Sequence, residues 1–237
     1  MLDQLEFVIR QLPNLLWGFP NNRPGGLLLS VLLSAGSIVV GFGFATVLGF
    51  AQHNRWSVVR FVAGRVVWLI RGIPLIVLLI LLFQILGTGI IFGLELTAFQ
   101  TAAVTLILYA AAYQADIVRA GIAAVPNQLR DDARLLGASR ITVARTVTIP
   151  YAARVMRPAL VTQAITIFKD SSVVVVLGVV DLTTTARIAL GSNVENAPFW
   201  VGTYLMVGLL YWIVAFALAK VARPRRGPLL APEVAIS

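Results

Sequence analysis

The chain of 237 residues contains no cysteine, one histidine and only two lysines, and 12% of its residues are charged. Without cysteine, neither a disulfide bond nor a thiolate metal site can form, and His53 alone is too little for a histidine-based metal site. Neither lysine stands in the G-x-x-x-x-G-K-[ST] pattern of a nucleotide-binding loop. The chain is therefore not expected to be an enzyme, and the sequence offers no catalytic residue and no metal site.

Hydrophobic residues make up 59% of the sequence, and the charged fraction is half of the quarter or so that a soluble domain carries. A bilayer core needs about 20 apolar residues in a helix. The sequence therefore predicts an all-α, polytopic membrane protein with five transmembrane helices. They are expected within residues 27–52, 72–86, 96–115, 158–180 and 199–219. The Arg-bearing residues 53–65 and the polar residues 181–198 are expected to lie between spans, the latter as a loop.

The predicted transmembrane domain, residues 27–223, lies between two smaller segments. In residues 1–26, apolar side chains recur at helical spacing, which predicts an amphipathic helix over 2–16 on the outer membrane surface. The C-terminal residues 224–237 are expected to form a disordered cytoplasmic tail. The residues that define the amphipathic face are Leu5, Val8, Leu12 and Leu15.

A polar stretch from Asp131 to Pro150 interrupts the apolar blocks, inside a predicted loop over 117–150. It begins with two carboxylates and an alanine, and Gly137 follows four residues after Ala133. Carboxylates favour the first turn of a helix, and glycine favours the position just after its end. The pattern predicts a helix near 131–136 with both carboxylates in its first turn, then a turn at Gly137 and a second helix. Such a helix suits a partner outside the bilayer.

The spacing of Asp131-Asp132-Ala133, Gly137, Val147 and Ile149-Pro150 resembles the EAA loop of ABC importer permeases. Asp131 replaces the glutamate of that pattern, Asp132 replaces its first alanine, and two aliphatic residues are exchanged. Three further segments resemble elements of the polar amino acid subgroup and occur in the order of that family. They are Leu69–Pro74 with an Arg-Gly-x-Pro element, Tyr113–Ile122, and Phe168–Leu182 with a Lys-Asp-Ser-Ser element.

This resemblance covers roughly residues 27 to 223 and implies a type I ABC importer fold. It implies a permease subunit that moves a polar or charged amino acid into the cytoplasm by alternating access. ATP and Mg²⁺ then belong to separate ATPase subunits, and this chain carries no cofactor. The other implied partners are a second permease subunit, identical or related, an extracytoplasmic solute-binding protein and membrane lipid, but no nucleic acid.

The resemblance also assigns residues to two sites. The expected contact with the ATPase, here named the coupling surface, consists of Asp131, Asp132, Ala133, Leu136 and Gly137. The expected substrate path includes Arg71, Lys169, Asp170, Ser171 and Ser172.

Three local expectations follow from the residues themselves. Pro74 should bend the second span, because proline removes a backbone donor and clashes with the preceding turn. Asp116 and Arg119 are three residues apart and should pair on one helix. Lys169 and Asp170 fall in the middle of the predicted fourth span, where charge marks a transport path or a buried ion pair.

The distribution of basic residues predicts the orientation in a bacterial inner membrane. With Arg71 and Lys169 left out as membrane-embedded, 14 lysines and arginines fall on one side of five spans and three on the other. Cytoplasmic loops carry the excess of such residues. The N-terminus is therefore expected outside, the C-terminus inside and the 131–150 stretch in the cytoplasm.

Two other readings remain open: an ion-coupled secondary transporter, and a membrane-embedded enzyme or assembly scaffold. An ion-coupled secondary transporter would use the pair Lys169 and Asp170 as its coupling site, although it would not need the long Arg-bearing loop. A membrane-embedded enzyme would need a nucleophile, metal or cofactor set that the sequence does not offer. An assembly scaffold would have no use for Lys169 and Asp170 within the membrane.

Overall fold

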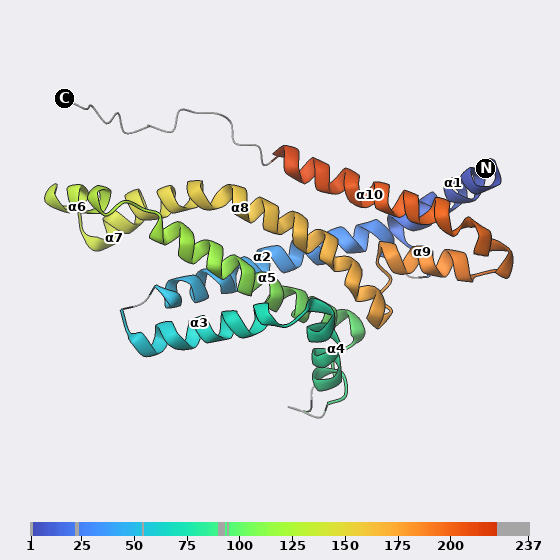
Figure 1. Ribbon diagram of the computed structural model, residues 1–237, viewed down its shortest axis with the longest axis horizontal. Helices are drawn as coiled ribbons and strands as arrows, with labels where there is room; N and C mark the ends of the chain where they lie inside the picture. The colour runs from blue at the N-terminus through green and yellow to red at the C-terminus, as the bar shows by residue number, and fades with distance from the viewer. Residues whose placement is uncertain (1, 22–23, 54, 90–92, 94, 222–237) are drawn as a thin grey trace.

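The computed structural model describes residues 2–21, 24–53, 55–89, 93 and 95–221 (Figure 1). Across these residues the protein is helical, and the one extended pairing is an isolated bridge between Gly26 and Asp181. The expected cytoplasmic tail, 224–237, lies outside the described residues. In chain order the helices are α1 (Leu2–Trp17), α2 (Gly26–Gln52), α3 (Ser57–Gly72), α4 (Leu75–Leu86), α5 (Ala98–Ala123), α6 (Asn127–Leu135), α7 (Arg140–Val143), the π-helical η1 (Ala144–Thr148), α8 (Ile149–Asp170), the 3-10 helical η2 (Ser171–Leu177), α9 (Leu182–Gly191), the 3-10 helical η3 (Val194–Phe199) and α10 (Trp200–Val221).

Among the described residues, four helical segments are long and apolar enough to cross a membrane, and α3 with α4 forms a fifth span if the bent pair is counted as one. The predicted all-α architecture with five spans is confirmed on this count. The four other segments run over Gly26–Gln52, Ala98–Ala123, Arg140–Leu177 and Val194–Lys220.

The second span begins earlier than predicted. The arginines in residues 53–65 indicated a loop, but α3 starts at Ser57 and includes Arg60 and Arg65, whose side chains are exposed. A long aliphatic stem lets an arginine sit on a helix near the membrane edge while its guanidinium reaches water. A prediction from charge alone therefore put the start of this helix too late in the sequence, because it excluded the residues around Arg60 and Arg65.

The helical segment that contains most of the predicted fourth span, 158–180, begins earlier, at Arg140, and ends at Leu177. It includes α7, η1, α8 and η2. Lys169 and Asp170 lie where α8 passes into η2. The expectation that this charged pair lies within the membrane stays a prediction.

The bend at Pro74 is confirmed. Ile73 has extended backbone angles, φ −96° and ψ 128°, as expected for a residue that precedes proline. Pro74 occupies the N-cap of α4, and the axes of α3 and α4 differ by 105°. As a result α4 projects away from the long axis shared by the other spans (Figure 1). The break leaves Arg71 on the last turn of α3.

The centre of the molecule is the contact between α2 and α5, the most extensive between any two of its described helices. Two glycines allow this approach. A Cβ atom at Gly41 would lie 2.9 Å from Cβ of Ala110, and one at Gly49 would lie 2.6 Å from Cγ1 of Val118. Small residues at such contacts are typical of helix packing in membranes. The pair therefore forms a close backbone contact on which α3, α4 and α8 pack.

The predicted N-terminal amphipathic helix is present as α1, but part of its apolar face is covered by protein. Val8 and Leu15 are buried, with Leu15 against α9 and α10, and the rings of Phe7 and Phe199 stack with centroids 4.8 Å apart. Leu5, by contrast, is 57% exposed. The apolar stripe thus docks α1 onto the end of the helical bundle (Figure 1).

The stretch 181–198, predicted as a polar loop, contains α9 and η3 instead. Asp181 is fully buried and caps α9, because its Oδ1 accepts the backbone N–H of Thr184 at 2.8 Å. Its Oδ2 accepts a hydrogen bond from the hydroxyl of Tyr211 at 3.3 Å. The missed signal was this cap followed by Leu182, Ala186 and Ala189, which are buried at helical spacing.

Asp181→Asn is expected to keep or increase stability at neutral pH, whereas Asp181→Ala is expected to lose about 2–3 kcal/mol through the cap and the buried hydrogen bond. Burial raises the pKa of the Asp181 carboxyl above its ordinary 3.8, despite the hydrogen bonds that favour its charge. A raised folded-state pKa means that the folded state keeps its proton where the unfolded state has lost it. Stability should then fall as pH rises above about 3.8 in the native protein.

Asparagine keeps the acceptor and is neutral, so this contribution to the pH dependence should vanish in Asp181→Asn. Unfolding temperatures from pH 4 to pH 8 in detergent measure the effect. A native-like slope in the asparagine variant would assign the slope to other groups.

Candidate functional site

One end of the molecule carries α6, α7 and the start of α8, together with the connection from α2 to α3 (Figure 1). The predicted helix, turn and second helix of the 131–150 stretch are all present. Gly137 has φ +82°, the left-handed conformation that ends α6 at glycine with little strain. Ser139 then caps α7 by accepting the N–H of Thr142 at 3.2 Å. The sharp turn sets α6 outside the line of the spans.

Two details of the predicted helix are corrected. It begins at Asn127, four residues before Asp131, so Asp131 and Asp132 lie in its second turn and not in its first. Pro126 at the N-cap sets this start, because proline is tolerated where helical N–H groups have no intrahelical partner. The carboxylates therefore gain less from the helix dipole than the sequence suggested. Asp131 pairs instead with Arg134, at 3.3 Å.

The coupling surface is open. Asp131, Asp132, Leu136 and Gly137 are exposed and Ala133 is half-buried. Leu136 is 89% exposed and its neighbour Leu135 is 86% exposed. Two leucines exposed in a polar loop form an apolar tip that a partner protein would cover. Their contact with the ATPase stays a prediction.

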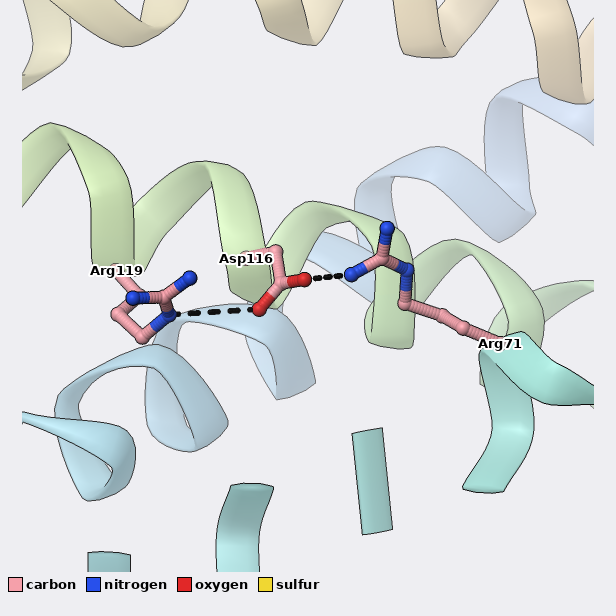
Figure 2. Close-up of polar contacts among 3 residues, drawn as sticks. All are labelled: Arg71, Asp116 and Arg119. Atoms are coloured by element: carbon pink, nitrogen blue, oxygen red, sulfur yellow. Dashed lines mark hydrogen bonds and ion pairs between the residues drawn. The ribbon is translucent and has the colours of Figure 1, made fainter. Parts of the chain in front are cut away.

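A cluster of charges joins the bend of the second span to α5. Asp116 lies between Arg71 and Arg119, and each guanidinium pairs with one of its carboxylate oxygens (Figure 2). The predicted pair with Arg119 is confirmed, with 3.5 Å between Nε and Oδ1. The pair with Arg71 was not predicted. Arg71 also lies over the ring of Tyr113, 4.9 Å from its centroid.

The cluster borders a cavity of about 590 Å³ between the end of α3, α5 and α8, here named the inner cavity. Gln163 of α8 lines it as well, and its buried Nε2 has no hydrogen-bond partner among the described residues. The walls thus offer two guanidinium groups, one carboxylate and one unpaired amide donor. Groups of both signs in one cavity match a ligand that carries both charges. The polar lining residues are Arg71, Tyr113, Asp116, Arg119 and Gln163.

The other expected path residues lie at the junction of α8 and η2. Lys169 is exposed, Asp170 and Ser172 are half-buried and Ser171 is fully buried. The hydroxyl of Ser171 donates to the carbonyl of Phe168 at 2.7 Å, so it helps to end α8. Within the described residues, Lys169 and Asp170 form no ion pair with each other.

Two tyrosines of α5 connect these residues with the inner cavity. The ring centroids of Tyr109 and Tyr113 are 4.7 Å apart. The helix α5, which carries both tyrosines, packs against α3 with Arg71 and against α8 and η2 with Asp170 and Ser172. Tyr109, Tyr113 and Asp116 thus form one polar stripe at helical spacing on α5. The stripe brings Arg71 and Asp170, which are far apart in sequence, to opposite ends of one surface.

Comparisons with known proteins agree with this arrangement. The chain is 28% identical over 200 residues to the inner membrane amino-acid ABC transporter permease protein YhdY of Escherichia coli (strain K12), covering 83% of this chain and 53% of that protein. It is 28% identical over 204 residues to the glutamate/glutamine/aspartate/asparagine transport system permease protein BztC of Rhodobacter capsulatus, covering 83% and 45%. The chain thus spans about half the length of these two relatives.

A third relative is matched along most of its length. The glutamine transport system permease protein GlnP of Escherichia coli (strain K12) is 29% identical over 197 residues, covering 83% of this chain and 88% of GlnP. All three relatives are permeases, in agreement with the prediction of a transport subunit and not an enzyme.

Solved structures show the same fold. The crystal structure of an amino acid ABC transporter with histidines matches 90% of this chain and 93% of its own, with a TM-score of 0.77 and 26% identity. A chain of the inward-facing MetNI methionine ABC transporter matches with a TM-score of 0.64 and 20% identity, which shows the fold alone. The predicted type I ABC importer fold is confirmed.

The family described as the inner membrane component of binding-protein-dependent transport systems matches residues 37–226, well over half of the chain. The chain is therefore a multi-pass inner membrane protein, and it belongs to this family of ABC importer permeases.

Proposed function

We propose that this chain is the membrane-spanning subunit of an ATP-driven importer that carries a polar amino acid into the cytoplasm. The observation that carries the proposal is the similarity to the glutamine permease GlnP, which covers 83% of this chain and 88% of GlnP. The inner cavity supports it, because its carboxylate and guanidinium groups complement the ammonium and carboxylate of an amino acid. None of the relatives or structures described above supports the ion-coupled alternative.

The substrate path extends along the stripe on α5. Arg71 and Asp116 form its inner end, and Lys169, Asp170 and Ser172 form its other end, with Tyr109 and Tyr113 between. Ser171 supports this end by closing the last turn of α8. An amino acid in the inner cavity would exchange the contact between Arg71 and Asp116 for contacts to its own two charges. The ion pair thus opens when substrate enters and closes when it leaves.

Energy for the cycle comes from partner subunits. ATPase subunits, which hold ATP and Mg²⁺, dock on the coupling surface and cover the apolar tip of Leu135 and Leu136. A second permease subunit completes the path, and an extracytoplasmic binding protein delivers the amino acid. The orientation with the N-terminus outside places α6 in the cytoplasm. The gathering of the Arg-bearing connections at the end that holds α6 supports it (Figure 1).

Purification of the tagged chain from its native host in mild detergent tests this function. We expect a stoichiometric P-loop ATPase to copurify, and its hydrolysis to rise when the binding protein and an amino acid are added. In proteoliposomes, labelled glutamine should accumulate only with ATP, and competition by unlabelled amino acids then defines the substrate. Uptake driven by a sodium or proton gradient, without an ATPase, would establish the secondary-transporter reading instead.

A further inference from the structure

Arg130 of α6 makes a contact that none of the sequence patterns indicated. Its Nη2 donates to the carbonyl of Ile122 at 2.9 Å and to the carbonyl of Val125 at 3.0 Å. Ile122 lies in the last turn of α5, and both accepting residues are buried. The last carbonyls of a helix have no intrahelical donor, and a cation is favourable at that end. Arg130 thus closes the C-terminal end of α5 from the neighbouring helix.

This contact is central to how α6 is held. No residue of α6 is fully buried, and only Arg130 and Ala133 are half-buried. The helix also contacts α7 and η1, and the carbonyl of Ala133 accepts the N–H of Ala138 in the turn. Of the two hydrogen bonds of Arg130, the one to Ile122 joins α6 to α5, and the one to Val125 joins α6 to the short connection that includes Pro126. Without it, α6 would be held only by that connection and by its contacts with α7 and η1.

The same helix continues to the charge cluster. Asp116 lies six residues before Ile122 on the unbroken α5, about 9 Å along its axis. Asp116 in turn pairs with Arg71 at the bend between α3 and α4 (Figure 2). A continuous series of contacts therefore runs from α6 through Arg130 and α5 to the ion pair that borders the inner cavity.

We propose that Arg130 is a positioning residue that makes α6 and α5 move as one body, so that displacement of the coupling surface reaches the Arg71–Asp116 pair. The inference rests on the proposed function. Lysine cannot reproduce the contact fully, because its single ammonium lacks the planar fork of donors that arginine presents. Methionine keeps the aliphatic stem but loses every donor.

The test compares Arg130→Met, Arg130→Lys and a control, Arg154→Met, which removes an exposed arginine near the start of α8. Each variant is assembled with its ATPase in proteoliposomes, and amino acid imported per ATP hydrolysed is measured. Arg130→Met should keep ATPase binding and hydrolysis within about twofold and lose import per ATP by at least about tenfold. Arg130→Lys should fall between, and Arg154→Met should match the native protein.

Unchanged import per ATP in Arg130→Met would overturn the inference, as would loss of ATPase binding, which would make Arg130 a docking residue. If the native protein showed no ATP-driven import, the proposed function would fail instead, and the two failures are distinguishable.

A second measurement does not depend on transport. The chain has no native cysteine, so in a double variant with Leu135→Cys on α6 and Val39→Cys on α2 these two positions alone take up spin labels. Both positions are exposed. The distance distribution between the labels should be narrow with Arg130 and broad in Arg130→Met. Equal widths in the two proteins would also overturn the inference.

Discussion

Asp116→Asn is expected to lower amino acid import by about 10- to 100-fold while the folded protein stays intact. A hydrogen bond to a charged group contributes about 1.5–3 kcal/mol, which corresponds to that range if the substrate ammonium loses its partner. Removing the carboxylate also leaves Arg71 and Arg119 facing one cavity without an anion. The effect on stability should be small, because the side chains of Arg71 and Asp116 are 40% and 28% exposed and water screens the pair.

The measurement is ATP-driven uptake in proteoliposomes, with the unfolding temperature recorded in parallel. Glu195→Gln serves as the control, because it neutralises an exposed carboxylate in η3, away from the cavity. The exchanged pair Arg71→Asp with Asp116→Arg distinguishes two roles for the contact. Recovery of import in the exchanged pair would mean that the residues only hold each other and do not contact substrate.

Gly137→Asp is expected to abolish ATP-driven import, and Gly137→Asn is expected to retain most of it. Gly137 has φ +82°, and a Cβ atom there would meet nothing within 4 Å. The space is free, and asparagine and aspartate enter the left-handed region more readily than other side chains do. They have the same shape, so their comparison isolates the charge. A carboxylate at this position lies at the negative end of α6 and adds to the negative charge of Asp131 and Asp132.

Copurification of the ATPase and import by the reconstituted complex measure the effect, and helix content by circular dichroism shows that both variants fold. Native-like import by the aspartate variant would rule out Gly137 and its neighbours as the contact with the ATPase. Equal loss in both variants would indicate that the backbone conformation at Gly137 matters and the charge does not.

The elements predicted correctly from sequence are those whose cause is local. Pro74 interrupts the helix because it holds the residue before it in an extended conformation, and Gly137 ends α6 because the turn needs a positive φ. The pairing of Asp116 with Arg119 follows from helical spacing alone.

What could not be predicted depends on distant parts of the chain. Arg71 and Asp116 are visible in the sequence, but only the packing of α3 against α5 brings them together. The burial of Asp181, which capped a helix in a stretch predicted as a loop, requires Tyr211 from another span. Arg60 and Arg65 misled the prediction because hydropathy counts a whole residue, whereas the stem and the charged group of an arginine occupy different surroundings.

At one end of the molecule, described hydrogen bonds join segments that are far apart in the sequence. At the end that carries α1 and α9, the N–H of Gly26 donates to Val180 at 3.0 Å and that of Leu182 to Oγ of Ser30 at 3.2 Å. These bonds fasten the start of α2 to the chain that follows α8. The joined segments therefore form a fixed point, here named the fulcrum, about which α8 can rotate as a rigid rod. Since α8 is 22 residues long, about 33 Å, a rotation of roughly 10° about that fulcrum would move its far end by about 6 Å.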